Sequence, residues 1–215
     1  MSSYPRLRAS ALELFASRGF QATGIRDLAA ASGLSLATLY YYMSNKEELL
    51  FSLMSESLER LQDDAERALK EVRTPIEGLA ALTIMHVLAH GLRQTQTVVV
   101  DTELRSLNQE HRAKIVELRD RYEQLWRRQL SEGVALNMLS VPDLRVTRLA
   151  LLEMCTGVAY WYAPDGELEL DDVAAVHAEL VLAQVQARGG RKRLQLKDLN
   201  LPPVTWYHEL VAHHT

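Results

Sequence analysis

The chain has 215 residues, of which 47% are hydrophobic and 24% are charged, and its formal net charge is −4. These values describe an ordinary soluble protein of one large or two small domains. A single cysteine, Cys155, excludes an intrachain disulfide and agrees with a reducing compartment. Glu13 and Arg18 interrupt the N-terminal apolar stretch, which excludes a secretory signal, and the uncharged run over residues 78–92 is shorter than the roughly 20 residues that span a membrane. We therefore expect a cytoplasmic protein without membrane contact.

The composition favours helices throughout. Ala, Leu, Glu and Arg dominate, whereas 10 Gly, 6 Pro and little alternation of Val, Ile and Thr leave few signals for hairpins. The hydrophobic periodicity divides the chain into about nine helices, so the predicted fold class is all-α.

Three short helices are predicted at the N-terminus. The first covers about residues 5–18, and the second begins with Thr23 as its N-cap and ends at Gly33. Ser35 is the N-cap candidate of a third helix of about two turns, residues 36–43. Two short helices joined by a turn of three or four residues that contains glycine predict a helix-turn-helix.

Three consecutive tyrosines occupy this third helix. Tyr40, Tyr41 and Tyr42 point in directions about 100° apart, so they cannot all enter a core, and some must project outward beside Ser35 and Thr38. Hydroxyl groups and a helix N-terminus can hold phosphate oxygens, and aromatic edges can contact base edges in the major groove. Taken alone, the triplet fits a DNA-recognition helix and a tyrosine-rich surface for a protein partner equally well.

A long helix, about residues 46–70, follows at once. Either Ser44 with Glu47 or Asn45 with Glu48 can form its capping box. Lys46 in its first turn is unfavourable next to the helix dipole, and a phosphate brought by a partner would explain this cation.

The stretch RASALELFASRGFQATGIRDLAAASGLSLATLYYYMSNKEELL, residues 8–50, resembles the TetR family of bacterial transcriptional regulators. The resemblance implies a helix-turn-helix DNA-binding domain over residues 1–48 and a helical ligand-binding and dimerisation domain over residues 49–188. The remaining residues, 189–215, are interpreted as a C-terminal extension outside the resemblance. It also implies a repressor that binds a palindromic double-stranded DNA operator as a homodimer and is released by a small hydrophobic effector.

The resemblance also implies roles for single residues. Thr23 and Arg26 would face the DNA backbone, and Ser35, Leu36, Ala37, Thr38 and Tyr41 would lie in the major groove. Tyr40, Tyr42 and Lys46 would bind phosphates. Leu36 and Met43 depart from the family pattern, and Leu36 would offer apolar contact, for example to a thymine methyl group, in place of hydrogen bonds.

Two apolar helices are predicted in the second half. Thr74 with Glu77 forms a capping box with Pro75 at the first helical position, and the helix that follows, to about residue 92, is apolar nearly all round. Such a helix belongs in the middle of a bundle, whereas the charged helix around residues 111–126 has a single apolar stripe and covers the outside.

A further helix begins at Pro142-Asp143. Because Glu153 is its only charge over residues 149–162, we expect one face on a ligand pocket and another on a partner subunit. A helix over about residues 171–188 would lie beside it, and TetR-like proteins are implied to dimerise through such helices.

The segment over residues 152–182 resembles a TetR subgroup that senses acyl-CoA thioesters. The candidate effector-binding residues are His86, His90, Tyr122, Trp126, Cys155, Tyr160 and Trp161. The tyrosine and tryptophan at 160 and 161 could line a pocket or stack on an adenine ring, or they could belong to the core or to a dimer interface. His86 and His90 could line the pocket, bind a metal or be satisfied core histidines. Because no His-Glu-x-x-His or Glu-x-x-His pattern is present, we expect no metal and no cofactor.

No catalytic motif supports an enzyme, since Gly-x-Ser-x-Gly, phosphate-loop and dinucleotide patterns are absent from the sequence. The alternatives are a TetR-type regulator of efflux or stress genes that senses an aromatic or lipophilic compound and, in another class, a helical enzyme or protein-binding adaptor. The basic run over residues 188–197 is interpreted as a solvated segment or a nucleic-acid arm. The tail over residues 194–215 either docks on the bundle or hangs free.

Overall fold

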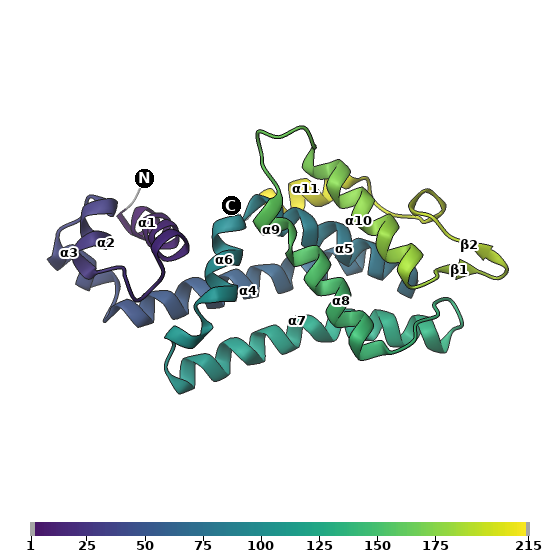
Figure 1. Ribbon diagram of the computed structural model, residues 1–215, viewed down its shortest axis with the longest axis horizontal. Coiled ribbons are helices and arrows are strands. Elements are labelled where there is room, and N and C mark those ends of the chain that lie inside the picture. The colour runs from purple at the N-terminus through teal and green to yellow at the C-terminus, as the bar shows by residue number, and fades with distance from the viewer. Residues whose placement is uncertain (1–2, 214–215) are drawn as a thin grey trace. The chain divides into compact units, whose positions relative to one another are not determined.

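The predicted all-α fold is confirmed. A computed structural model describes residues 3–213, and within this range helices and loops account for everything except one short hairpin. In chain order the elements are α1 (Ser3–Arg18), α2 (Ile25–Ser32), α3 (Leu36–Tyr42), α4 (Lys46–Lys70), α5 (Pro75–Leu92), α6 (Gln94–Thr102), the 3-10 helix η1 (Leu104–Ser106), α7 (Gln109–Ala135), α8 (Leu144–Thr156), α9 (Val158–Trp161), α10 (Leu170–Gln184), β1 (Arg188–Gly189), β2 (Lys192–Arg193), the 3-10 helix η2 (Leu196–Asp198) and α11 (Val204–Ala212) (Figure 1).

The contacts divide the chain into two compact units. The first comprises residues up to Glu59 together with Gln94–Arg119, and the second comprises Arg60–Arg93 together with the residues from Asp120 onward. The first unit includes α6 because this helix packs against α1, although the sequence placed it in the ligand-binding domain. The domain limits at residues 48 and 188 remain predictions.

A helix-turn-helix forms in the first unit, as predicted. Leu7, Phe15, Leu28 and Leu39 are fully buried and hold α1, α2 and α3 together. The turn between α2 and α3 begins at Gly33, whose φ of 64° lies in the left-handed region.

The N-cap predicted for α2 is wrong. Gly24 occupies that position, and its backbone N–H donates to Asp27 Oδ2 at 2.7 Å. The hydroxyl of Thr23 instead donates to the carbonyl oxygen of Gly19 at 2.9 Å, inside the loop that leads into the helix. For α4 the Asn45 register is observed, since Asn45 Oδ1 accepts a hydrogen bond from the N–H of Glu48 at 2.9 Å.

Replacing Gly33 by alanine should destabilise the protein by about 1 kcal/mol, because a side chain in the left-handed region is strained. A methyl group there would meet its nearest neighbour, Arg6 Nη1, at 3.9 Å, so the cost comes from the backbone and not from a clash. Urea unfolding of both proteins measures the difference. A variant as stable as the wild type would contradict the left-handed turn.

The second unit is built around α5. Its predicted start is confirmed: Thr74 Oγ1 accepts from the N–H of Glu77, Glu77 Oε2 accepts from the N–H of Thr74, and Pro75 follows the N-cap. Helices α8, α9, α10 and α11 all pack against α5 (Figure 1). The helix is long and apolar enough to cross a membrane, but 83% of it is buried inside the protein, so it is the core helix that its pattern predicts.

The helix predicted to continue to residue 162 breaks at Gly157. α8 ends at Thr156 and the single-turn helix α9 follows, because the N–H of Tyr160 bonds to the carbonyl of Gly157 at 3.0 Å in a tighter turn. Glycine is a poor helix former and tolerates this change of geometry.

The C-terminal segment docks on the second unit. α11 packs against α5 and buries Tyr207, Leu210 and Val211, which decides between the two alternatives for the tail. The basic run lies in an exposed antiparallel hairpin in which Arg188 pairs with Arg193. This hairpin was not predicted, since its strands are only two residues long and carry no alternating apolar pattern.

Candidate functional site

Helix α3 exposes the residues that the sequence marked for contact. Leu39 is fully buried against α1 and α2, whereas Tyr40 is 56% exposed and Tyr41 is 83% exposed. Ser35 caps the helix by accepting from the N–H of Thr38 at 3.1 Å, and its hydroxyl is 2.8 Å from that of Thr38. Ser35, Leu36 and Ala37 are exposed as well. The start of α3 therefore exposes hydroxyl and methyl groups, and the phenol groups of Tyr40 and Tyr41 lie exposed in the following turn.

Tyr42 is half-buried, in contrast to its two neighbours. Its ring lies 5.4 Å from the ring of Tyr4 and 5.2 Å from the ring of Tyr41, centroid to centroid. The triplet thus divides into two outward rings and one ring that packs at the edge of the unit. Arg26 is exposed on α2, and the guanidinium of Arg6 lies beside the helix-turn-helix turn at Gly33. Sequence reasoning gave Tyr4 and Arg6 no role, since nothing local marks their proximity to α3.

Two residues predicted to contact DNA are engaged inside the protein. Thr23 is 1% exposed and its hydroxyl donates to the carbonyl oxygen of Gly19, so we leave its side chain out of the proposed DNA interface. Lys46 Nζ donates to the carbonyl oxygens of Phe20 at 2.6 Å and Thr23 at 2.7 Å, and it lies 4.1 Å above the Phe20 ring. Burial lowers the pKa of Lys46, and the nearby Glu103 opposes this shift. These two carbonyl oxygens therefore account for a lysine in the first turn of α4 without a bound phosphate.

The same loop is bound by the segment that follows α6. Glu103 Oε1 accepts from the N–H of Phe20 at 3.0 Å, and Glu103 Oε2 accepts from the Ser106 hydroxyl at 2.7 Å. At the start of α7, His111 Nδ1 lies 3.0 Å from Glu47 Oε1, and its ring stacks on Phe51 at 3.8 Å. The α1–α2 loop and the start of α4 are thus held by Glu103, which follows α6, and by His111 at the start of α7.

Four of the predicted effector residues meet in the core of the second unit. His86 Nδ1 is 2.7 Å from the Tyr122 hydroxyl, and the His86 ring stacks on His90 at 3.9 Å and meets the edge of Trp126 at 5.7 Å. The other ring nitrogen, His86 Nε2, is 3.0 Å from Thr156 Oγ1. His86 is therefore a satisfied buried histidine at the centre of an aromatic cluster. We call His86, His90, Tyr122, Trp126 and Thr156 the His86 cluster.

The remaining predicted effector residues are Cys155, Tyr160 and Trp161, which lie on α8 and α9. Cys155 is fully buried on α8 next to Thr156. Trp161 is half-exposed and stacks on His177 at 6.1 Å, and Tyr160 is exposed. Thr156 and His177 escaped sequence reasoning because no spacing along the chain pairs them with His86 or Trp161. Within residues 3–213, no group of three or more His, Cys, Asp and Glu side chains is placed to hold a metal ion.

Burial holds the histidines of the cluster in their neutral forms. It lowers the pKa of His90 from 6.5 to about 4, and it lowers the pKa of His86 well below 6.5, helped by the neighbouring His90 and His177. In the unfolded chain both rings take up a proton below pH 6.5, so their contribution to stability is complete above that pH and decreases as the pH falls, for His90 until about pH 4.

Stability should therefore decrease between pH 7 and pH 5, by about 2 kcal/mol for His90, and His86 should add to the decrease in the same direction. Denaturant unfolding at a series of pH values measures this slope. His90→Gln, which cannot titrate, should reduce the slope by the share of one histidine. A variant with an unchanged slope would show that His90 takes up its proton equally in the folded and unfolded states.

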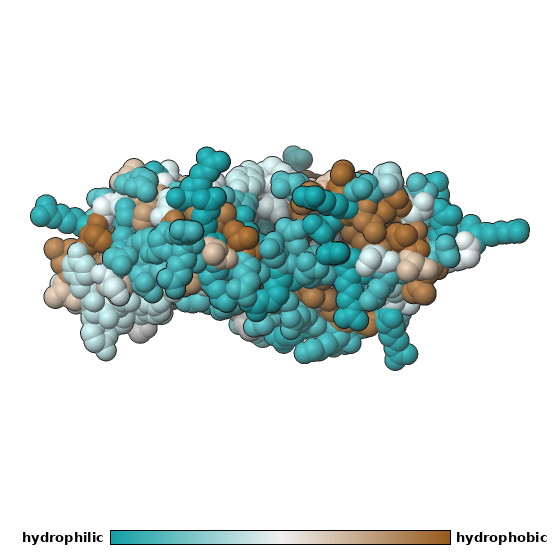
Figure 2. All heavy atoms as spheres, turned by 90° about the horizontal axis from the view of Figure 1, so that it is seen from below, coloured by the Kyte–Doolittle hydropathy of each residue, from teal (hydrophilic) through white to brown (hydrophobic). Residues whose placement is uncertain are grey.

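An apolar surface remains uncovered on the second unit. Val146 and Leu149 on α8, Trp161 on α9, and Val176 and Leu180 on α10 are large apolar side chains that lie exposed. Figure 2 shows apolar residues gathered in a broad brown area among hydrophilic ones. Exposed apolar surface of this kind is typical of a site of association.

Comparison with known proteins identifies the family. Residues 7–53 match the bacterial regulatory proteins of the tetR family, and residues 72–185 match the tetracyclin repressor-like C-terminal domain. The HTH-type transcriptional repressor KstR2 of Mycolicibacterium smegmatis is 29% identical over 185 residues, which are 85% of this chain and 90% of that protein. The crystal structure of the TetR family transcriptional regulator PfmR from Thermus thermophilus has 33% identity and a TM-score of 0.75, over 83% of this chain and 97% of that one. AibR, solved with isovaleryl coenzyme A and operator DNA, shares the fold with 23% identity and a TM-score of 0.76, over 84% of this chain and 98% of that one.

The chain belongs to the TetR family of bacterial transcriptional regulators. It is a regulator with an N-terminal helix-turn-helix DNA-binding domain, and not an enzyme, as the sequence predicted.

Proposed function

We propose that the protein is a dimeric repressor that binds a palindromic operator through α3 and leaves it when an acyl-CoA thioester binds the second unit. The observation that carries the DNA-binding part is the outward position of Tyr40 and Tyr41 next to the exposed first turn of α3, while Leu39 anchors the helix. Phenol and hydroxyl groups bind phosphate oxygens, and the exposed Leu36 and Ala37 offer apolar contact to base edges.

The exposed apolar surface on α8, α9 and α10 supports the dimer. A two-fold dimer buries the same surface on both copies and presents two copies of α3 to one duplex. Recognition helices of such a dimer bind half-sites about 34–36 Å apart, which requires a palindromic operator.

The effector part rests on the His86 cluster and on the relatives. KstR2 is a transcriptional repressor, and AibR has been solved with an acyl-CoA and operator DNA. In this chain the His86 cluster gathers aromatic rings and a few hydrogen-bonding groups in the buried core of the second unit, and this chemistry suits an acyl chain and its thioester. The aromatic rings also favour a second candidate, an aromatic or lipophilic compound sensed by a regulator of efflux or stress genes.

The release mechanism uses segments that belong to both units. The helices α4 and α7 and the chain after α5 run from one unit into the other. In the first unit, Glu103 holds the loop between α1 and α2, and His111 holds the start of α4. An effector that prefers a state with differently spaced α3 helices would lower operator affinity. A coupling free energy of about 1–3 kcal/mol, or about 5–150-fold, is sufficient.

Selection of bound duplexes from a random library, followed by anisotropy titration at fixed salt, tests the proposal. We expect a palindromic site bound by two chains, and release by CoA thioesters of a preferred chain length. Retention of no duplex would contradict DNA recognition by α3. Release by aromatic compounds but by no thioester would replace the effector with the second candidate.

A further inference from the structure

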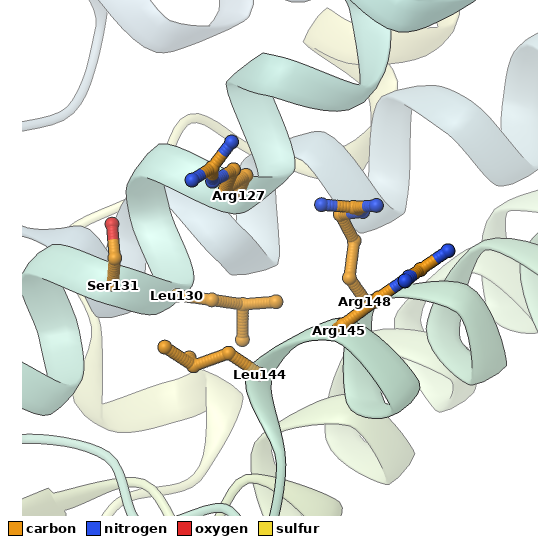
Figure 3. Close-up of a pocket in the computed structure, with 6 residues that line it drawn as sticks. All are labelled: Arg127, Leu130, Ser131, Leu144, Arg145 and Arg148. Carbon is orange, nitrogen blue, oxygen red and sulfur yellow. The ribbon is translucent and has the colours of Figure 1, made fainter.

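A pocket of about 550 Å³ lies between α7 and α8 in the second unit (Figure 3). Its lining residues are Arg127, Leu130 and Ser131 on α7 and Leu144, Arg145 and Arg148 on α8. Figure 3 shows Leu130 and Leu144 close to each other, with Arg127 above them and with Arg145 and Arg148 on the facing helix. The pocket therefore combines an apolar wall with three arginine side chains.

The positive charge of this pocket is only partly balanced. Arg148 Nη2 pairs with Glu123 Oε2 at 3.1 Å, whereas Arg148 Nε is buried and has no hydrogen-bond partner within the described residues. Arg127 and Arg145 are exposed, and between residues 3 and 213 neither makes an ion pair with a carboxylate. Guanidinium groups bind phosphate oxygens through two parallel hydrogen bonds, so three of them around one carboxylate suit a phosphorylated ligand.

The pocket and the His86 cluster share the same two helices. About 8 Å of α7 separates Arg127 from Tyr122, and about 10 Å of α8 separates Arg148 from Cys155, at 1.5 Å per residue. The helices run antiparallel here, because Leu130 and Ser131 of α7 share the pocket with Leu144 of α8, whereas Glu123, earlier on α7, pairs with Arg148, later on α8. An elongated ligand with phosphates in the pocket would thus extend its other end toward buried apolar and aromatic side chains.

We propose that Arg127, Arg145 and Arg148 bind the phosphate groups of the effector, and that its acyl end lies against the His86 cluster. The inference rests on the proposed function, since a CoA thioester carries phosphates at one end and an acyl chain at the other. The phosphates of a free nucleotide have the same chemistry, so the experiment separates the two sources.

The test uses Arg127→Ala combined with Arg145→Ala in the full chain, with Arg128→Ala as the matched control. Arg128 lies next to Arg127 on α7 but pairs with Glu132 and does not line the pocket. The first measurement is the concentration of acyl-CoA that releases half of the operator. The double variant should need an acyl-CoA concentration at least about tenfold higher, because each substitution removes a charge-assisted hydrogen bond to phosphate. The Arg128→Ala control should match the wild type.

Two further ligands separate the phosphates from the acyl chain. The matching S-acyl-pantetheine, which lacks phosphates, should release the operator poorly from the wild type. Adenosine 3′,5′-bisphosphate, which lacks the acyl arm, should raise the melting temperature of the wild type and of Arg128→Ala but not of the double variant.

Each contrary result has a distinct meaning. Equal release of wild type and double variant by acyl-CoA, or equal potency of S-acyl-pantetheine and acyl-CoA on the wild type, would overturn the phosphate site and leave the acyl-CoA effector intact. Loss of dimer or of operator binding by the double variant without effector would assign the arginines to assembly and would also overturn the site. No response of the wild type to any thioester, with the bisphosphate still bound only when the arginines are present, would refute the effector and support a free nucleotide as the source of the phosphate.

Discussion

Operator affinity is expected to fall at least about 100-fold when Tyr40 and Tyr41 are both replaced by alanine. Each phenol on the outward side of α3 loses a contact of about 1 kcal/mol or more, and the loss occurs twice in a dimer. The fold should be unaffected, because both rings are largely exposed and such substitutions change stability by about 0.5 kcal/mol or less. Anisotropy titration at fixed salt measures the affinity, and thermal unfolding checks the fold.

Two controls make this comparison specific. Leu136→Ala removes another exposed apolar side chain, outside the proposed interface, and should leave operator affinity unchanged. Tyr41→Phe keeps the ring and removes the hydroxyl, so an intermediate loss would assign part of the contact to the phenol oxygen. Wild-type affinity in the double alanine variant would remove both tyrosines from the interface.

Arg93→Met is expected to lower the free energy of unfolding by about 3–5 kcal/mol. The Arg93 guanidinium donates to Asp64 Oδ2 at 3.1 Å and to the carbonyl oxygen of Val211 on α11, and the Asp64 side chain is fully buried. Removing the arginine deprives the buried Asp64 carboxylate of this cation and also removes a donor that holds α11. Denaturant unfolding of the full chain measures the change.

A double substitution separates the ion pair from simple packing. Arg93→Met together with Asp64→Leu removes both charges and should recover most of the lost stability, because apolar pairs replace buried ion pairs at little cost. Arg128→Met breaks an exposed pair with Glu132 and should cost about 0.5 kcal/mol or less. If Arg93→Met were as stable as Arg128→Met, this would contradict the contribution of the buried Arg93–Asp64 pair to stability.

Local chemistry made much of the fold predictable. Ser35, Gly33, Thr74 and Asp143 stand at helix ends in the structure because capping depends on residues a few positions apart. The all-round apolar pattern of α5 likewise predicted its burial, since only a central helix can bury every face.

The missed features depend on partners far along the chain. The sequence predicts that Lys46 binds a phosphate, because its charge is unfavourable next to the helix dipole. In the structure the α1–α2 loop brings the carbonyl oxygens of Phe20 and Thr23 to it. The docking of α11 includes a hydrogen bond from Arg93, which lies more than a hundred residues away along the chain. The pocket arginines lie on α7 and α8, which meet only in the folded second unit. Periodicity and capping carry no information about such long-range contacts.

The most direct measurement of α3 entering the DNA groove uses a cysteine introduced at the exposed position Ala37. The native Cys155 does not compete for iodoacetamide, because it is fully buried and burial raises its pKa to about 12. The rate of alkylation of Ala37→Cys is compared with and without operator duplex at a concentration that saturates binding by anisotropy. We predict that operator slows the reaction by about tenfold or more, whereas an equal rate on the saturated duplex would contradict the placement of α3 in the groove.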